Sequence, residues 1–296
     1  MTRTRLGLAI WLSGVLALSM YACAGFASVS DGSNAVNCEW QVCVRWRDTS
    51  RGRTYFVTNA GPVPATVRVD LRVLRNLRGR GGRPARTPIE RVVARESTET
   101  LTFLETVIQG VPIGADLSVL IDLGASDTQP DDYLYGMPFG GTEARPLLQG
   151  FDGAETHMFG MRYALDFGMP GGTPIVAARD GIVVHVQDGF TEGGPDPDLL
   201  ERSNLVVVGH GDGTLAFYGH LSPGIPVAVG DPVREGDSLG RSGATGFAGQ
   251  PHLHFHVGVR AMGDPGRTIR IRLKDSSGQE VELETGRSYE PARTLM

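Results

Sequence analysis

The chain has 296 residues, of which 41 are glycine, about twice the usual share. Because glycine is unfavourable inside helices, this composition excludes a mostly helical protein. The hydrophobic fraction of 41% and the charged fraction of 21% are those of globular proteins, which excludes a disordered or collagen-like chain. We therefore predict a packed, turn-rich protein that is built mainly from β-strands.

The formal net charge of -5 conceals a difference between the two halves of the chain. Residues 1–126 contain 15 arginines and 10 acidic residues, whereas residues 127–296 contain 13 basic and 23 acidic residues. All seven histidines also lie in the second half. This asymmetry predicts two domains with different surfaces.

The N-terminus has the pattern of a secretory signal, which we place at residues 1–27. Residues 1–5 are basic, residues 6–20 form an apolar run of 15, and small residues follow. The run is shorter than the roughly 20 residues that a membrane-spanning helix needs, although an uncleaved membrane anchor remains the alternative. Residues 20–23 also faintly resemble a lipobox, so lipidation of Cys23 is a second alternative.

Export determines the expected environment and partners. We expect a periplasmic or extracellular protein, associated with the cell envelope, with no stable membrane span after cleavage and no nucleic-acid partner. In an oxidising compartment Cys38 and Cys43 are able to bridge each other, although the sequence does not settle whether they do.

Residues 35–125 are predicted to form a β-sandwich-like accessory domain. Period-2 alternation indicates a half-solvated antiparallel sheet, with Val67, Val69, Leu71 and Val73 on one face. Strands are expected at 41–46, 53–58, 65–74, 90–94, 100–108 and 117–121. An arginine-rich loop at 76–87 is interpreted as a solvated connection rather than a site for an anionic polymer.

A linker or strap at 126–145, rich in Gly, Pro and Asp, leads to a second β domain at 146–296. Strands are expected at 163–167, 174–178, 181–187, 204–208, 214–218 and 253–259, followed by a hairpin of 268–274 and 280–284. Residues 189–203 lack a strand pattern and are predicted to form a mobile surface loop.

The most informative segment is PHLHFHV at residues 251–257. In a strand, His252, His254 and His256 project from one face, while the apolar residues between them enter the core. Three imidazoles on one face favour a metal site, because neutral imidazole is a good zinc ligand. The outer two are about 13 Å apart along a strand, so further ligands must come from elsewhere in the chain.

His157 and Asp166 are the candidates for those further ligands. Asp166 lies in the apolar segment YALDFG, where an unpaired carboxylate is costly and a metal is a natural partner. A buried aspartate satisfied by backbone or arginine is the alternative interpretation. Two histidines and an aspartate, with one open position for water, are a typical catalytic zinc set.

Several motifs in order resemble the lysostaphin-type zinc endopeptidases, which cut peptide cross-links in bacterial cell walls. The resemblance covers roughly 145–260. Its motifs are His157 with Asp166, YGHL at 218–221, PHLHF at 251–255, MPGGTP at 169–174, AARDG at 177–181, VGDPV at 229–233 and EGDSLGRSG at 235–243. The longer gap between His157 and Asp166 is similar to one secreted branch of the family, in which a β-rich region often precedes the catalytic domain.

Carried over position by position, the resemblance implies one zinc ion per catalytic domain, held by His157, Asp166 and His254. It implies that His252 is the catalytic base and His220 the second active-site histidine. His256 departs from the family pattern, where glutamate is usual, and is interpreted as a residue behind the ligands or at the surface. His185 and His210 match no catalytic position and are interpreted as structural.

The expected architecture is all-β: a β-sandwich-like N-terminal domain followed by a lysostaphin-type antiparallel β catalytic domain. The expected function is that of a secreted zinc metalloendopeptidase whose partner is a peptidoglycan peptide. A non-catalytic wall-binding or regulatory module that retains a structural zinc is the alternative, and a domain that zinc merely stabilises is a third hypothesis. The sequence leaves open which bond is cut, what the accessory domain does and the oligomeric state.

Overall fold

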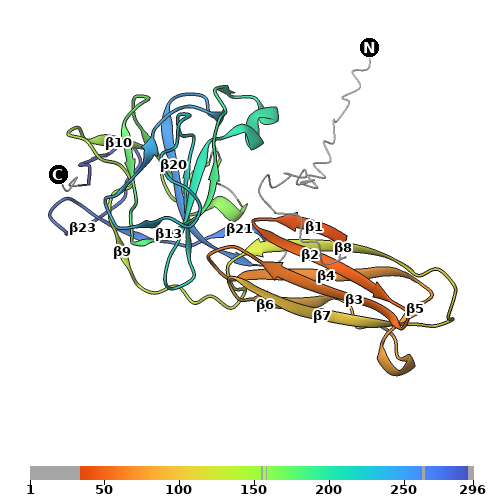
Figure 1. The fold of residues 1–296 in the computed structure, drawn as a ribbon. Helices are drawn as coiled ribbons and strands as arrows, with labels where there is room; N and C mark the ends of the chain where they lie inside the picture. The colour runs from red at the N-terminus through yellow and green to blue at the C-terminus, as the bar shows by residue number, and fades with distance from the viewer. Residues whose placement is uncertain (1–33, 155, 158, 262–263, 293–296) are drawn as a thin grey trace, which may run out of the picture.

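The computed structural model describes residues 34–154, 156–157, 159–261 and 264–292. The expected signal segment 1–27, with Cys23, lies outside these ranges. The prediction of an all-β protein is confirmed, since the described residues contain strands and only three short 3-10 helices (Figure 1). Within the same ranges, no helix is long and apolar enough to cross a membrane.

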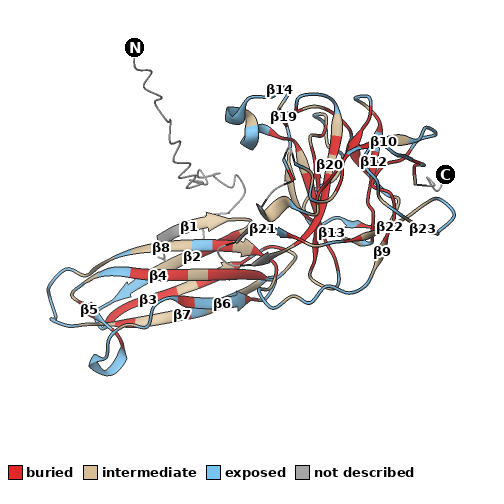
Figure 2. Ribbon diagram, turned by 180° about the vertical axis from the view of Figure 1, so that it is seen from behind, coloured by how far each residue is buried: buried red, intermediate tan, exposed pale blue. Residues whose placement is uncertain are grey.

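Two antiparallel sheets form the N-terminal unit, one of five strands in the order β1-β2-β3-β7-β5 and one of three in the order β6-β4-β8. Valines and leucines from both sheets bury their side chains between them, so the unit is a small sandwich (Figure 2). Its elements are β1 (Asn34–Glu39), β2 (Val42–Thr49), β3 (Gly52–Asn59), β4 (Ala65–Arg75), β5 (Leu77–Arg78), η1 (Arg80–Gly82), β6 (Ile89–Val93), β7 (Ser97–Thr106) and β8 (Gly114–Leu123).

The predicted face of β4 is correct for Val67, Val69 and Leu71, which are buried, but wrong for Val73, which is 46% exposed. The register with β8 shifts between Leu71 and Val73, which marks a β-bulge. An extra residue reverses the alternation beyond it, so Leu74 packs against the core instead.

The cysteines left open by the sequence form a disulfide, Cys38–Cys43. The two residues face each other across the hairpin of β1 and β2, whose turn is Trp40 and Gln41, both with positive φ. The bridge therefore closes the hairpin from which Trp40 reaches the second unit.

The second unit is organised around an antiparallel sheet with the strand order β17-β13-β15-β16-β20-β11-β10-β24, and β21 pairs with β20. Smaller pairs β12-β18 and β14-β19 and a three-stranded group β23-β22-β9 surround it. The elements are β9 (Leu134–Tyr135), β10 (Arg145–Gln149), η2 (Phe159–Met161), β11 (Leu165–Gly168), β12 (Pro174–Val176), β13 (Gly181–Gln187), β14 (Gly193–Gly194), η3 (Pro197–Arg202), β15 (Leu205–Gly209), β16 (Leu215–Gly219), β17 (Pro232–Val233), β18 (Ser238–Arg241), β19 (Gly246–Phe247), β20 (His252–Ala261), β21 (Asp264–Thr268), β22 (Arg272–Lys274), β23 (Glu280–Val281) and β24 (Ser288–Tyr289).

Two segments of this unit differ from the sequence prediction. Residues 189–203 are not without structure: β14 pairs in parallel with β19, and η3 follows. The predicted strand 268–274 is divided, because residues up to Thr268 pair with β20 as β21 and the final hairpin begins only at Arg272. Neither pairing is visible in an alternation pattern, since β14 and β19 are two residues each and β21 contains Pro265 and Gly266.

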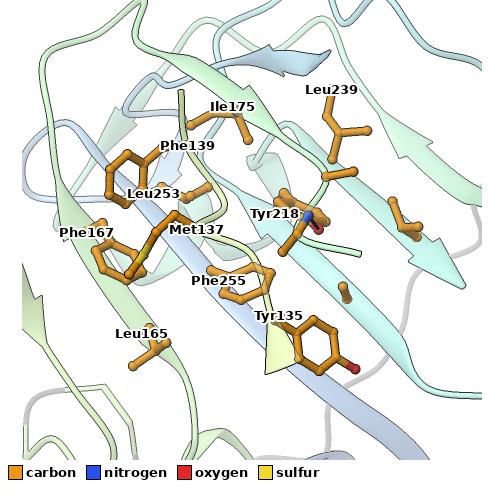
Figure 3. Close-up of a cluster of buried hydrophobic side chains, with 14 of the residues drawn as sticks. Tyr135, Met137, Phe139, Leu165, Phe167, Ile175, Tyr218, Leu239, Leu253 and Phe255 are labelled. Atoms are coloured by element: carbon orange, nitrogen blue, oxygen red, sulfur yellow. Dashed lines mark hydrogen bonds between the residues drawn. The ribbon is translucent and has the colours of Figure 1, made fainter. Parts of the chain in front are cut away.

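Aromatic and aliphatic side chains from distant segments form the core of the second unit (Figure 3). The expected linker 126–145 contributes to it directly, because Tyr135, Met137 and Phe139 are all at most 3% exposed. Phe139 packs against Phe167 of β11, with ring centroids 5.2 Å apart. Residues 133–139 of that segment are therefore a strap that belongs to the second unit.

We expect Phe139→Ala to destabilise the protein by about 3–5 kcal/mol, as truncation of a fully buried phenylalanine does. The reason is the cavity it leaves beside Phe167 under β11. Urea denaturation measures the effect, with Tyr133→Ala, also in the strap but only half-buried, as the comparison. Equal, small decreases in the free energy of unfolding of the two variants would show that the strap is not part of the core.

The two units contact each other through a small apolar cluster of Leu123, Val184, Val207 and Leu215, with Trp40 and Val63 packed against it. The Trp40 ring meets the edge of the His185 imidazole at 4.6 Å between centroids. His185 thus has the structural surroundings expected of it, at the junction of the units.

Candidate metal centre

Two adjacent strands of the large sheet carry the histidines and the aspartate. In the antiparallel register of β11 and β20, Asp166 faces His254 and Gly168 faces His252. Leu253, Phe255 and Val257 are fully buried, which confirms the predicted alternation of β20. The pairing fixes Asp166 and His254 as cross-strand neighbours, so two side chains 88 residues apart meet without help from a loop.

His157 reaches the same place from the loop between β10 and η2. Its Nδ1 lies 2.9 Å from the carbonyl oxygen of Gly150. Since a carbonyl only accepts, Nδ1 carries the proton in this contact, and Nε2 of the neutral ring is left with its lone pair. That nitrogen is buried, makes no hydrogen bond of good geometry and lies 3.1 Å from Asp166 Oδ2.

The arrangement of these three side chains fits a divalent cation. Ligand atoms of His157, Asp166 and His254 all lie within 4.8 Å of one another. The closest pair is His254 Nδ1 and Asp166 Oδ1, at 2.8 Å. A buried imidazole lone pair that faces a carboxylate is unfavourable unless a proton or a cation lies between them. Two imidazoles and one carboxylate are a donor set that zinc prefers.

The charge state of Asp166 supports this interpretation. Burial alone would raise the pKa of its carboxyl group, but the neighbouring imidazoles of His157 and His254 outweigh burial and hold the pKa well below its usual value. The carboxylate is therefore ionised at neutral pH. A buried negative charge flanked by two imidazoles gives the site the electrostatics that bind a cation.

His220 and His252 lie beside this cluster, with ring centroids 4.5 Å apart. His252 Nδ1 is 2.9 Å from the Gln250 carbonyl, and His220 Nδ1 is 2.8 Å from the Thr245 carbonyl. By the same argument as for His157, each ring presents an unprotonated Nε2 when it is neutral. His252 Nε2 lies 3.8 Å from Asp166 Oδ1, next to the cluster.

Burial, followed by the neighbouring His252 and His254, lowers the pKa of His220 to about 3. Its backbone φ is +60°, an uncommon value for a residue other than glycine, at the end of β16. The Ser203 hydroxyl accepts from the His220 backbone N–H at 3.0 Å. This strained turn, braced by Ser203 and Thr245, directs the ring towards His252.

The remaining two histidines of interest are both buried. His256 is 5% exposed, so a surface position is wrong: its Nδ1 lies 3.0 Å from His254 Nε2, and its ring stacks on Phe217 at 4.4 Å. It therefore lies behind His254, the other position considered for it. His210 bonds the Asp180 carbonyl, and burial lowers the pKa of its ring to about 4. It lies outside the cluster.

Sequence reasoning missed two kinds of residue that support the cluster. Ser203 and Thr245, which brace His220, come from segments assigned no role. Gln149, whose amide reaches Asp166, lies in β10, a strand that was not predicted because Pro146 and a bulge interrupt its pattern. The only sequence signal for Gln149 was its position directly before Gly150, in the glycine-containing segment that leads to His157.

Comparison with known proteins finds one matching family. The model of peptidase family M23 matches residues 160–266 of this chain. Asp166, His220, His252 and His254 lie inside the match, and His157 lies three residues before it. The lysostaphin-type resemblance seen in the sequence is therefore confirmed.

Three curated relatives are similar to this chain. Lysostaphin of Staphylococcus simulans is 38% identical over 103 residues, which are 35% of this chain and 19% of that protein. Peptidoglycan DD-endopeptidase ShyA of Vibrio cholerae is 37% identical over 135 residues, 44% of this chain and 28% of the relative. DD-carboxypeptidase/endopeptidase Mpg of Neisseria meningitidis is 30% identical over 159 residues, which are 53% of this chain and 32% of that protein. The chain thus spans less than a third of each relative.

Among solved structures, the catalytic domain of the prophage-encoded M23 protein EnpA from Enterococcus faecalis is 27% identical. The similarity covers 45% of this chain and 93% of that one, with a TM-score of 0.33.

Proposed function

We propose that this protein is an exported zinc metalloendopeptidase that hydrolyses peptide cross-links of bacterial peptidoglycan. The proposal rests on one observation: the side chains of His157, Asp166 and His254 form a cluster. His220 and His252 lie beside that cluster. The relatives ShyA and Mpg, a peptidoglycan DD-endopeptidase and a DD-carboxypeptidase/endopeptidase, support this substrate class.

His157, Asp166 and His254 would hold one zinc ion through Nε2, a carboxylate oxygen and Nδ1. When bound, zinc supplies Lewis acidity, which polarises a carbonyl and makes bound water easier to deprotonate. The Gly150 carbonyl fixes the tautomer of His157, and His256 contacts the opposite nitrogen of His254. The chain therefore orients both imidazole ligands from behind.

His252 is the proposed general base. Its proton on Nδ1 is engaged by the Gln250 carbonyl, so Nε2 is the nitrogen that accepts a proton from the attacking water and returns it to the leaving amine. In this step the C–N bond of the peptide breaks, the carbonyl carbon gains the hydroxyl group of the water, and the leaving amine gains the proton that His252 carried.

His220 is the proposed second active-site histidine. The Thr245 carbonyl holds its Nδ1 proton, and its low pKa keeps the ring neutral in the resting site. It acts by orienting the substrate, because its Nε2 carries a lone pair that accepts a hydrogen bond. The braces from Ser203 and Thr245 keep this ring in place before the substrate arrives.

We expect the purified protein to release new amino groups from peptidoglycan, and a zinc chelator to abolish this release. Zinc added back should restore it, because the ligands belong to the fold. Reducing sugar ends should not increase, since glycan bonds are not the substrate. Zinc binding without release of amines would favour a non-catalytic wall-binding module, and loss of the fold on zinc removal would favour a purely structural zinc.

A further inference from the structure

The side chain of Gln149 is enclosed behind the proposed metal centre, at the end of β10. It is only 9% exposed and faces Asp166 in the register of β10 and β11. Its Nε2 donates to Asp166 Oδ2 at 3.1 Å and to Thr156 Oγ1 at 2.7 Å. Its Oε1 accepts from the Thr156 backbone N–H at 3.3 Å. One carboxamide therefore joins a proposed ligand to the residue just before another.

The two oxygens of Asp166 have different surroundings because of this contact. Oδ2 accepts from Gln149 and lies beside His157 Nε2. Oδ1 faces His254 Nδ1 at 2.8 Å. Rotation of the carboxylate about its last bond would break the contact with Gln149, so the amide selects one orientation of the group.

The residue that follows Gln149 serves His157 in a comparable way. The Gly150 carbonyl accepts from His157 Nδ1, and the Gly150 N–H donates to Thr285 Oγ1 at 3.2 Å. A side chain at Gly153 would collide with that of Gln149, which shows how closely the loop is folded over the amide. Residues 149 and 150 thus contact two of the three proposed ligands. Both lie outside the region that matches the family model.

We propose that Gln149 is a positioning residue that orients Asp166 and fixes the His157 loop for metal binding. The proposal rests on the proposed function in so far as His157 and Asp166 are taken as zinc ligands. Gln149 touches neither metal nor substrate. Its contribution is preorganisation: without the amide, Asp166 and the loop must be ordered when the metal binds, which lowers affinity.

The variant Gln149→Met keeps the length and volume of the side chain and removes the three hydrogen bonds described above with Asp166 and Thr156. We expect its dissociation constant for zinc to rise about 10- to 100-fold, the range seen when partners behind metal ligands are removed. Competition with a chromogenic chelator measures this constant without reference to activity. At saturating zinc, kcat and KM should return towards their wild-type values, since the reacting groups are intact.

Two further variants keep the test decisive. Thr156→Val removes the acceptor of the second amide hydrogen at an exposed position that the fold tolerates, and should weaken zinc binding less than Gln149→Met does. Gln279→Met makes the same chemical change in an exposed turn and should leave zinc binding unchanged. Melting of each metal-free protein separates loss of positioning from loss of fold.

Zinc affinity of Gln149→Met equal to that of wild type would overturn the proposal, as would a loss that melting of the metal-free protein fully explains. If Gln149→Met does not fold, wild-type affinity in Thr156→Val overturns it instead. Failure of the proposed function looks different, because the wild-type protein itself would then bind no zinc or release no amines.

Discussion

His254→Ala should lose both zinc and activity. Structural zinc sites bind the metal with roughly 10–16 kcal/mol, and by that scale one of three protein ligands accounts for about 3–5 kcal/mol, a loss of about 150- to 4,000-fold in affinity. Because His254 is also the cross-strand partner of Asp166, its removal leaves that buried carboxylate with one fewer imidazole. Metal analysis after dialysis and release of amino groups from peptidoglycan measure the two losses together.

The matched control is His185→Ala, which removes an imidazole from the same unit but at the junction with Trp40. It should retain the full zinc content and turnover. Equal zinc content in His254→Ala and wild type would contradict the ligand assignment, whatever the effect on activity.

His252→Ala should retain zinc and lose turnover. Removal of a general base usually costs about 10²- to 10⁴-fold in rate, and the expected loss appears in kcat rather than in KM. The structural reason is that His252 lies opposite Gly168 and not opposite Asp166, so it borders the ligand cluster without belonging to it. Steady-state kinetics on a soluble muropeptide, with zinc content measured on the same sample, give the result.

The comparison of the two variants separates a catalytic from a structural zinc. His252 and His254 are two residues apart on one strand, yet their alanine variants should lose activity for different reasons. The His254 variant should lose the zinc ion, and the His252 variant should lose only the proton transfer. A His252→Ala protein with wild-type turnover would refute the role of base, and one that has lost its zinc would make His252 a ligand.

How much of the site could be predicted depends on the kind of contact. Strand alternation placed His252 and His254 on one face of β20 correctly, because Leu253 between them is buried on the opposite face. The need for further ligands, and a carboxylate within an apolar segment, made His157 and Asp166 candidates, and the resemblance to a family added their assignment as ligands and the role of His220. Asp166 meets His254 through strand register, which no local pattern reveals.

The parts that could not be predicted depend on irregular backbone and on distant hydrogen bonds. The bulge that exposes Val73 follows from the pairing of β4 and β8, not from the sequence of β4 alone. Gln149 looks like any polar residue until β10 pairs with β11. Phe139 was assigned to a linker because Gly and Pro surround it, although tertiary packing buries it completely.

Zinc-dependent hydrolysis of a peptide bond in peptidoglycan is tested most directly by digestion of a defined cross-linked muropeptide dimer. With zinc bound, mass spectrometry should show two fragments whose summed mass exceeds that of the dimer by one water, with the new amine and carboxyl ends at one peptide bond. The His252→Ala protein should leave the dimer intact. An uncut dimer in the presence of folded, zinc-loaded wild-type protein, or cleavage in the glycan, would contradict the account.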